Sequence, residues 1–210
     1  EATVKKAVEH FGSIEILVNN AGTGAVAHAE NITDEQFQSE FDIDLFGTFK
    51  FARAVANQAM IPANYGRIIN ISSMYGLVGN KVAGSAPYHA AKGGVVNLTR
   101  ALAAEWAVHG ITVNTICPGY FYTPLTTETL NSEFFQQHAK ETIPMERYGH
   151  EGELDTSVVF LASGVGDKNT FISFVLIGNI PDTAFYICFN FYDFSNCQDY
   201  HHIQFLLRCI

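Results

Sequence analysis

Three short runs of apolar, β-branched residues recur along the chain, with long helical segments between them. They are IEILVNN (14–20), RIINISS (67–73) and ITVNTIC (111–117). None alternates apolar with polar residues as a half-exposed strand does, which favours parallel strands that are covered on both faces. Strands that alternate with helices form right-handed βαβ units. The sequence therefore predicts an α/β fold built on a doubly wound parallel sheet.

Two long helices are predicted between these strands. The first spans about 33–60 and begins with a capping box formed by Thr33 and Gln36. The second spans about 88–109 and is closed by Gly110. It carries an apolar stripe at helical spacing, typical of a helix packed on a core: Val95, Leu98, Leu102 and Trp106.

Composition excludes several classes of function. Hydrophobic residues make up 48% and charged residues 16% of the 210 residues, a globular composition. The formal net charge of −9 argues against a nucleic-acid partner, because such proteins need clustered Lys and Arg. No apolar run is long enough to predict a membrane span. The four cysteines lack metal-ligand spacing, so we expect no metal site and a cytoplasmic protein.

Small and polar residues follow each predicted strand. In parallel α/β sheets, ligands bind beyond the carboxyl ends of the strands. The residues expected there are Asn19 to Gly22, Ser72 and Ser73, and Pro118 and Gly119. Their clustering predicts a ligand site at this edge of the sheet.

A glycine motif after the first predicted strand has two interpretations. GTGAVA (22–27) fits the pattern G-x-G-x-x-G/A, and Asp42 and Asp44 follow about 20 residues later, as in a dinucleotide site. However, the pyrophosphate needs a helix that opens directly from the glycines. Here the helix is delayed to Thr33. We therefore favour a glycine-rich loop that does not hold the pyrophosphate.

Tyr88 and Lys92 form a candidate catalytic pair in the segment YHAAK. Helical spacing places them about one turn apart on one face. A neighbouring ammonium lowers the pKa of a phenol from its usual value near ~10, which makes it a better acid and base. A hydroxyl from Ser73 can hold a substrate oxygen. Alone, such a pair often arises by chance on a helix surface.

The order of the motifs changes that judgement. NNAG, NISS, YHAAK and NTICPGYFYT follow one another in the strand-and-helix context described above. Over about residues 1–165 this series resembles the short-chain dehydrogenase/reductase family. The resemblance implies a Rossmann-type fold, NAD or NADP as cofactor, and hydride transfer to or from a hydroxyl or keto group of a small metabolite. Members that act on gluconate are similar, which implies a sugar acid as substrate; a 3-oxoacyl reductase is the alternative.

The resemblance also implies roles for individual residues. Tyr88 would be the acid/base, and Lys92 would lower its pKa and bind the nicotinamide ribose. Ser73 would hold the reacting oxygen, with Ser72 the less favoured candidate. Asp44 stands where the family has a catalytic Asn. The residues expected to bind the cofactor are Asn20, Ala21, Gly22, Tyr88, Lys92, Pro118, Gly119 and Thr123.

The chain departs from the family pattern at both ends. The family begins with a strand and the turn T-G-x-x-x-G-x-G, which this sequence does not contain. We therefore expect an incomplete Rossmann-type sheet that lacks the first strands and this turn. The corresponding alternative function is a non-catalytic fragment that binds NADH or NADPH weakly.

The sequence divides into two predicted parts, a short-chain dehydrogenase domain over 1–165 and a divergent tail over 166–210. The tail is interpreted as non-native sequence or as a substrate-capping segment, although 171–177 fits a strand. Family members pair through two long helices. The resemblance therefore implies a homodimer or homotetramer formed through residues near 34–60 and 88–109.

Overall fold

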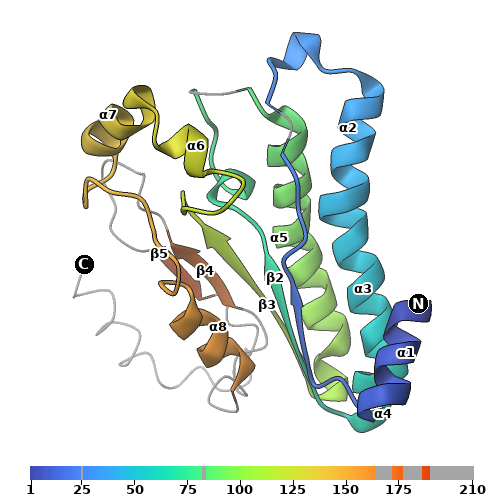
Figure 1. Cartoon of the computed structure of the whole chain (residues 1–210). Coiled ribbons are helices and arrows are strands. Elements are labelled where there is room, and N and C mark those ends of the chain that lie inside the picture. Colours follow the sequence, from blue (N-terminus) through green and yellow to red (C-terminus); the bar gives the residue numbers. More distant parts are fainter. Residues whose placement is uncertain (25, 82–83, 164–171, 177–185, 190–210) are drawn as a thin grey trace.

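A single five-stranded sheet organises the chain (Figure 1). The computed structural model describes residues 1–24, 26–81, 84–163, 172–176 and 186–189, the last two ranges as backbone only. The strands lie side by side in chain order. They are β1 (Ile16–Asn19), β2 (Gly66–Ile71), β3 (Ile111–Pro118), β4 (Ile172–Leu176) and β5 (Tyr186–Phe189). Neighbours from β1 to β4 are parallel and β5 is antiparallel to β4, so the three predicted strands and the parallel sheet are confirmed.

The helical segment between β1 and β2 is more complex than predicted. The capping box is confirmed, because Gln36 N donates to Thr33 Oγ1 and Thr33 N donates to Gln36 Oε1. Instead of one α-helix, the segment contains two stretches of π-helix, η2 and η3. Its parts are α2 (Asp34–Phe41), η2 (Asp42–Gly47), α3 (Thr48–Val55), η3 (Ala56–Met60) and α4 (Ile61–Ala63). π-Helical turns within longer helices are frequent at functional sites.

The helix between β2 and β3 follows the prediction closely. It consists of α5 (Ala86–Trp106) and the 3₁₀ turn η5 (Ala107–His109). Gly110 ends it with a φ of 67°, the left-handed conformation that favours glycine. A β-carbon at Gly110 would also lie 2.5 Å from the carbonyl oxygen of Asn64. Val95 and Leu102 of the predicted stripe are buried, and Leu98 and Trp106 pack against the core that contains Leu102.

Helices cover both faces of the sheet, as a doubly wound fold requires. On one face, α1 (Ala2–Phe11), α3 and α5 surround a core that includes Ile68 and Val113 (Figure 1). On the other face, Leu161 of α8 (Asp155–Ala162) packs against Ile69 and Ile116. This arrangement of layers confirms a Rossmann-type α/β architecture.

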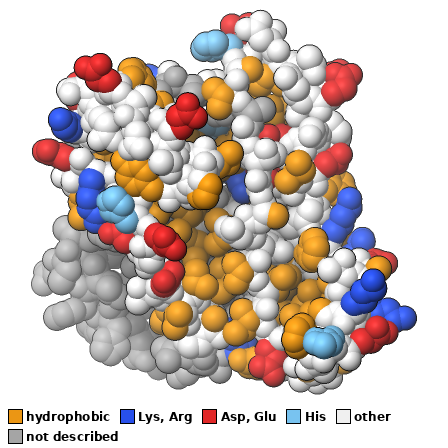
Figure 2. Space-filling model, in the orientation of Figure 1, with side chains coloured by type: hydrophobic (Ala, Val, Ile, Leu, Met, Phe, Trp, Pro, Cys, Tyr) orange, Lys and Arg blue, Asp and Glu red, His pale blue; other side chains and the backbone are white. Residues whose placement is uncertain are grey.

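The prediction that all three strands are covered on both faces is wrong for β1. Ile16 and Val18 are 47% and 42% exposed, whereas β2 and β3 are buried along almost their whole length. β1 lies at the edge of the sheet, and α8 packs over β2 and β3. Figure 2 shows hydrophobic side chains gathered across the middle of the face of the molecule that it draws.

A small helical layer lies above the carboxyl ends of β2 and β3 (Figure 1). It contains α6 (Thr127–Leu130) and α7 (Glu133–Thr142). Two 3₁₀ turns, η1 (Ala29–Asn31) and η4 (Met74–Gly76), follow β1 and β2. The layer has its own apolar cluster, with buried Leu130, Ala139, Ile143 and Tyr148.

The ends of the chain are described only in part. β4 falls within the predicted strand over 171–177, and the backbone of β5 was not foreseen. Most of residues 166–210 lies outside the described residues, so the division at 165 stays a prediction. Among the described residues, no helix combines the length and the apolar character of a membrane span.

Candidate active site

A buried polar network lies directly beneath the carboxyl ends of the strands. The Asn70 side chain on β2 accepts a hydrogen bond from Asn19 Nδ2 and donates one to Thr99 Oγ1, both at 2.9 Å. Thr115 Oγ1 on β3 donates to the Asn70 carbonyl, also at 2.9 Å. All four side chains are buried. The network therefore holds three strands and α5 in a defined relation just below the site.

The two serines after β2 have different surroundings. Ser72 Oγ donates to the carbonyl oxygen of Lys92 at 2.8 Å and so anchors α5 to the strand end. Ser73 instead forms a side-chain hydrogen bond with Tyr88, and its Oγ accepts one from the Tyr75 amide at 3.2 Å. The structure thus brings Ser73, rather than Ser72, to the candidate acid/base.

Lys92 lies on the same face of α5 as Tyr88, one turn further along. Its side chain is only 6% exposed, and its Nζ lies 5.5 Å from the centroid of the Tyr88 ring. The ammonium donates to the carbonyl oxygen of Ile71 at 3.2 Å and lies 3.6 Å from Asp44 Oδ2. Its position is therefore determined by β2 and η2 as well as by its own helix.

The electrostatics of Tyr88 differ from the sequence-based prediction. Lys92 was expected to lower the pKa of the phenol, but the pKa of Tyr88 lies above its usual value because the side chain is buried. The hydrogen bond from Ser73 lowers this pKa in part, and the carboxyl groups of Asp44 and Glu40 raise it further. Burial, the largest of these causes, depends on the tertiary structure and cannot be inferred from the spacing of Tyr88 and Lys92.

Asp44 is fully buried in η2 beside Lys92. Its Oδ1 accepts a hydrogen bond from the Thr23 amide at 2.8 Å, and its carbonyl accepts one from Thr48 Oγ1. Burial raises the pKa of Asp44, while Lys92 and a side-chain hydrogen bond with Glu40 lower it. Sequence reasoning missed Glu40, although its spacing of four residues from Asp44 in a predicted helix was a signal.

The glycine-rich loop after β1 lies against these residues. A β-carbon at Gly22 would lie 3.0 Å from Asp44 Oδ1 and 3.1 Å from Lys92 Nζ, so the backbone approaches both groups closely. A β-carbon at Gly24 would lie 3.8 Å from the Tyr88 ring. The next α-helix begins only at Asp34, which confirms that no helix opens directly from the glycines. Asn20, Ala21 and Gly22 are exposed and accessible to a ligand.

The residues at and after the end of β3 make fewer of the contacts that surround Tyr88 and Lys92. Pro118 ends β3, and both Pro118 and Gly119 are half-buried beside the carboxyl end of β2. Thr123 is exposed, and its side chain hydrogen-bonds to Thr126 at 2.9 Å. The described contacts therefore do not join Thr123 to Tyr88.

Aromatic and imidazole side chains also border the site. Tyr75 stacks on His89 with the ring centroids 4.7 Å apart, and its hydroxyl hydrogen-bonds to that of Tyr120. His89 Nδ1 lies 2.8 Å from the carbonyl oxygen of Ser85. The signal was their position, since Tyr75 follows Ser73 by two residues and His89 follows Tyr88. Over the described ranges, no group of three or more His, Cys, Asp or Glu is placed to hold a metal.

Known proteins match this chain over most of its length. Residues 1–173 match the family model described as enoyl-(acyl carrier protein) reductase. The 3-oxoacyl-[acyl-carrier-protein] reductase FabG of Vibrio cholerae is 38% identical over 164 residues, which are 78% of this chain. Those residues are 65% of the relative, so the chain spans slightly less than two thirds of its length.

Solved structures agree with the fold. A gluconate 5-dehydrogenase from Burkholderia cenocepacia, in complex with NADP and tartrate, matches with a TM-score of 0.80 and 33% identity over 87% of this chain and 71% of the other. A short-chain type dehydrogenase/reductase from Mycobacterium marinum matches with a TM-score of 0.80 and 31% identity over 87% and 70%. From the matched family model, these relatives and the shared fold, we conclude that the chain belongs to the short-chain dehydrogenase/reductase family.

Proposed function

We propose that the protein is an NAD(P)-dependent oxidoreductase that interconverts a hydroxyl and a keto group of a small metabolite. The observation that carries the proposal is the grouping of Ser73, Tyr88 and Lys92 at the carboxyl edge of the sheet. Ser73 hydrogen-bonds to Tyr88, and Lys92 lies one turn beyond it with its ammonium near the ring. A proton donor, an oxygen holder and a positive charge are the groups that carbonyl reduction needs beside a hydride donor.

The nicotinamide cofactor, when bound, supplies or accepts the hydride. In reduction, the Tyr88 hydroxyl gives its proton to the carbonyl oxygen as the hydride reaches the carbon, and the product is the alcohol. Ser73 donates a hydrogen bond to the same oxygen and so orients the substrate. Lys92 stabilises the phenolate that remains, and Asp44 holds Lys92 in place through the 3.6 Å ion pair.

The loop after β1 fits a flat cofactor lying across the site. Gly22 and Gly24 leave the space beside Lys92 and Tyr88 free of side chains, which a β-carbon at either position would enter. Lys92 would hold the ribose beside Tyr88. The remaining residues that would line the cofactor are Asn20, Ala21, Gly22, Pro118, Gly119 and Thr123. The NADP bound to the related gluconate 5-dehydrogenase supports NADP, although NAD suits the same chemistry.

The electrostatics of Tyr88 favour reduction at neutral pH. A phenol whose pKa is raised keeps its proton at pH 7 and is ready to donate it. Oxidation of an alcohol needs the phenolate instead. We therefore expect carbonyl reduction to dominate at neutral pH and alcohol oxidation to gain rate in alkaline solution.

Two substrate classes are proposed. The first is a sugar acid such as gluconate, supported by the similarity to gluconate 5-dehydrogenase. The second is a 3-oxoacyl group, supported by the reductase relatives. Steady-state rates with 5-ketogluconate and with a 3-oxoacyl thioester, each with NADPH and NADH, distinguish the two classes.

Matched variants test the assignment of the site. Tyr88→Phe should abolish turnover and leave the cofactor affinity nearly unchanged, because only the hydroxyl is removed. Ser73→Ala should lower kcat much more than Ser72→Ala, since only Ser73 reaches Tyr88. Calorimetry with NADPH and NADH measures cofactor binding separately. Absence of binding would support the non-catalytic alternative, and full activity of Tyr88→Phe would refute the catalytic assignment.

We also infer that the protein forms homodimers or homotetramers through helices near 34–60 and 88–109. Large apolar side chains on the first of these segments are exposed, among them Phe37, Phe46 and Phe51. Exposed aromatic side chains on one helical segment are typical of an interface. Light scattering of the purified protein and of Phe51→Glu tests this, and a wild-type monomer would contradict it.

A further inference from the structure

We propose that a cavity at the start of α5 binds the hydroxyl-bearing carbons of the substrate and so selects a sugar acid over a 3-oxoacyl group. The selection rests on the proposed function, to which it adds a substrate class and two residues, Ser85 and His89. Binding of a hydroxylated ligand in this cavity does not require turnover and can be measured separately.

The cavity lies beside the candidate acid/base. Its volume is about 560 Å³, within the range of small-molecule sites. Ser85 and His89 line it, three residues before and one residue after Tyr88. The loop after β1 connects the two places, because a β-carbon at Gly24 would lie 3.8 Å from the Tyr88 ring and Ala29 lines the cavity. A substrate of several carbons can therefore have its keto group at Tyr88 and its remaining carbons in the cavity.

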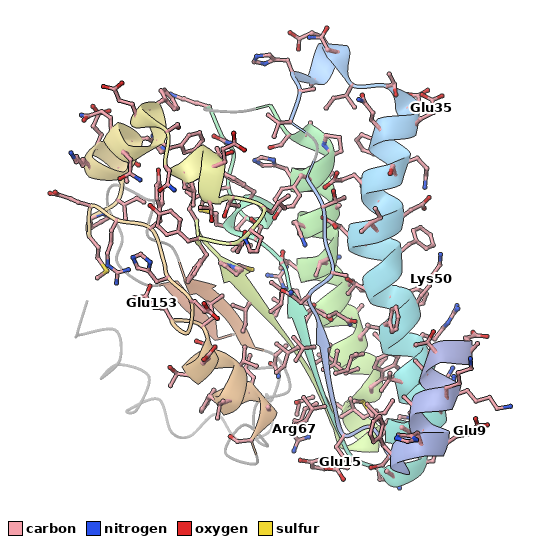
Figure 3. The ribbon with its side chains drawn as sticks, viewed as in Figure 1. Glu9, Glu15, Glu35, Lys50, Arg67 and Glu153 are labelled. Carbon is pink, nitrogen blue, oxygen red and sulfur yellow. The ribbon has the colours of Figure 1, made fainter. Side chains whose placement is uncertain are left out.

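The walls of the cavity are held in place by contacts between different segments. Figure 3 shows the loop after β1 beside the start of α5, and the Ala27 amide donates to the Gly84 carbonyl oxygen at 2.9 Å. A β-carbon at Gly84 would collide with the Ala27 carbonyl, so this approach requires glycine. The His89 ring stacks on Tyr75, whose hydroxyl hydrogen-bonds to Tyr120. The cavity is therefore formed before a ligand binds.

Ser85 and His89 together offer one hydrogen-bond donor and one acceptor. His89 Nδ1 lies 2.8 Å from the Ser85 carbonyl oxygen, which only accepts, so a neutral His89 carries its proton on Nδ1. Ser85 Oγ lies 3.1 Å from this protonated nitrogen and cannot donate to it, so its proton has no acceptor among the described residues. His89 Nε2 is then unprotonated, and it is buried with no hydrogen-bond partner in the described part of the chain.

A ligand hydroxyl group matches this pair. Buried polar atoms in folded proteins are nearly always hydrogen-bonded, so Nε2 marks a position that a ligand completes. A hydroxyl group can accept from Ser85 and donate to His89, whereas a methylene group can do neither.

The rest of the lining argues against an alkyl chain and against a charged group. It includes Ala29, Gly84, Ala86 and Ala90, which offer an alkyl chain little apolar surface. The described lining residues include no Asp, Glu, Lys or Arg, so they offer a carboxylate or a phosphate no ion-pair partner. Uncharged carbons that bear hydroxyl groups fit this lining. A sugar acid has such carbons next to its keto group, and a 3-oxoacyl chain has methylene groups there.

NMR of the full chain tests the binding without turnover. We expect gluconate, the product of 5-ketogluconate reduction, to shift the backbone amide resonances of Ser85, His89 and Ala90 in a saturable way. Hexanoate has the same number of carbons and the same carboxylate but no hydroxyl groups, and it should shift these resonances far less. Ala29→Leu narrows the cavity and should weaken gluconate binding at least about tenfold. Ala63→Leu, exposed in α4 at the other end of the sheet, is the matched control and should not change it (Figure 1).

Steady-state kinetics tests the selection. Ser85→Ala and His89→Phe should each lower kcat/KM for 5-ketogluconate by roughly 3- to 10-fold, mainly through KM, because each removes one hydrogen bond to the substrate. Both should change kcat/KM for ethyl acetoacetate, a 3-oxoacyl ester without hydroxyl groups, by less than about twofold. Phe at position 89 keeps the ring that stacks on Tyr75. Ser39→Ala, exposed in α2, is the control and should leave both substrates unaffected.

The outcomes separate this selection from the proposed function. Gluconate that leaves the three amides unchanged, or hexanoate that shifts them as strongly, would overturn the proposal. Equal losses for the two substrates in Ser85→Ala and His89→Phe would also overturn it. Gluconate bound in the cavity of a chain that reduces neither substrate would refute the proposed function and leave the binding site intact.

Discussion

Removing the Asn70 side chain should weaken the fold directly beneath the candidate site. The amide of Asn70 is fully buried and bridges β1 to α5 through two hydrogen bonds of 2.9 Å, to Asn19 and to Thr99. In Asn70→Ala both bonds are lost. The Asn19 amide then keeps only a 3.4 Å contact with the carbonyl oxygen of Thr48. The variant also leaves a small cavity between the strand and the helix.

The magnitude follows from these contacts. A buried hydrogen bond contributes about 0.5–1.5 kcal/mol net, and a buried donor left without a partner costs about 1–3 kcal/mol. We therefore expect Asn70→Ala to lower the free energy of unfolding by roughly 2–4 kcal/mol. Thr99→Val keeps the volume but removes the hydroxyl that accepts from Asn70 Nδ2, so we expect a loss of about 1–3 kcal/mol.

A double-mutant cycle measured by urea unfolding tests the reasoning. Once Asn70 is absent, Thr99→Val no longer leaves the Asn70 Nδ2 donor without a partner. The free energy of unfolding of the double variant should therefore fall by at least about 1 kcal/mol less than the sum of the two single losses. Asn57→Ala, at an exposed position in η3, is the control and should change stability by less than about 0.5 kcal/mol. Additive losses, within about 0.5 kcal/mol, would refute the proposed coupling.

Three further predictions concern single positions. Burial raises the pKa of Asp44 above its unfolded value of 3.8, so the stability that its protonated form contributes is present below that pH and is lost as the pH rises. In urea melts, Asp44→Asn should therefore become progressively more stable relative to wild type as the pH rises above 3.8, and an unchanged difference would contradict this. Burial raises the pKa of the Cys117 thiol to about 11. At about pH 8, Cys117 should therefore be alkylated on the order of 100-fold more slowly in the native protein than in the denatured protein. Mass spectrometry of the Cys117 peptide measures both rates, and equal rates would count against this burial. Thr33→Ala removes the hydroxyl of the capping box and should lower the free energy of unfolding by about 1 kcal/mol. An unchanged free energy of unfolding would show that α2 does not depend on its cap.

Local sequence signals predicted much of the secondary structure. The capping box at Thr33 and the closing glycine at Gly110 act within one turn of the chain, so their residue types alone identify the helix ends. The two π-helical segments between 42 and 60 were not predicted. The first packs against α5 and the second against α1, and no local pattern encodes these contacts.

The exposed face of β1 illustrates the same limit. Its composition resembles that of β2, but a strand is covered on both faces only when its place in the sheet allows it. β1 lies at the edge, so Ile16 and Val18 remain exposed. Strand order depends on pairing between segments that are about 50 residues apart, such as Val18 with Ile69.

The sequence by itself determined the α/β class, the strands and helices that form it, and the spacing that places Tyr88 and Lys92 on one helical face. It did so because periodicity, capping and turn residues act over short distances along the chain. Tertiary structure alone decided that Ser73 rather than Ser72 reaches Tyr88, and that the pKa of Tyr88 is raised. It also decided that the carboxyl group of Asp44 lies beside the ammonium of Lys92. Burial and charge at a site depend on residues that different segments bring together, and these distances exist only in the folded chain.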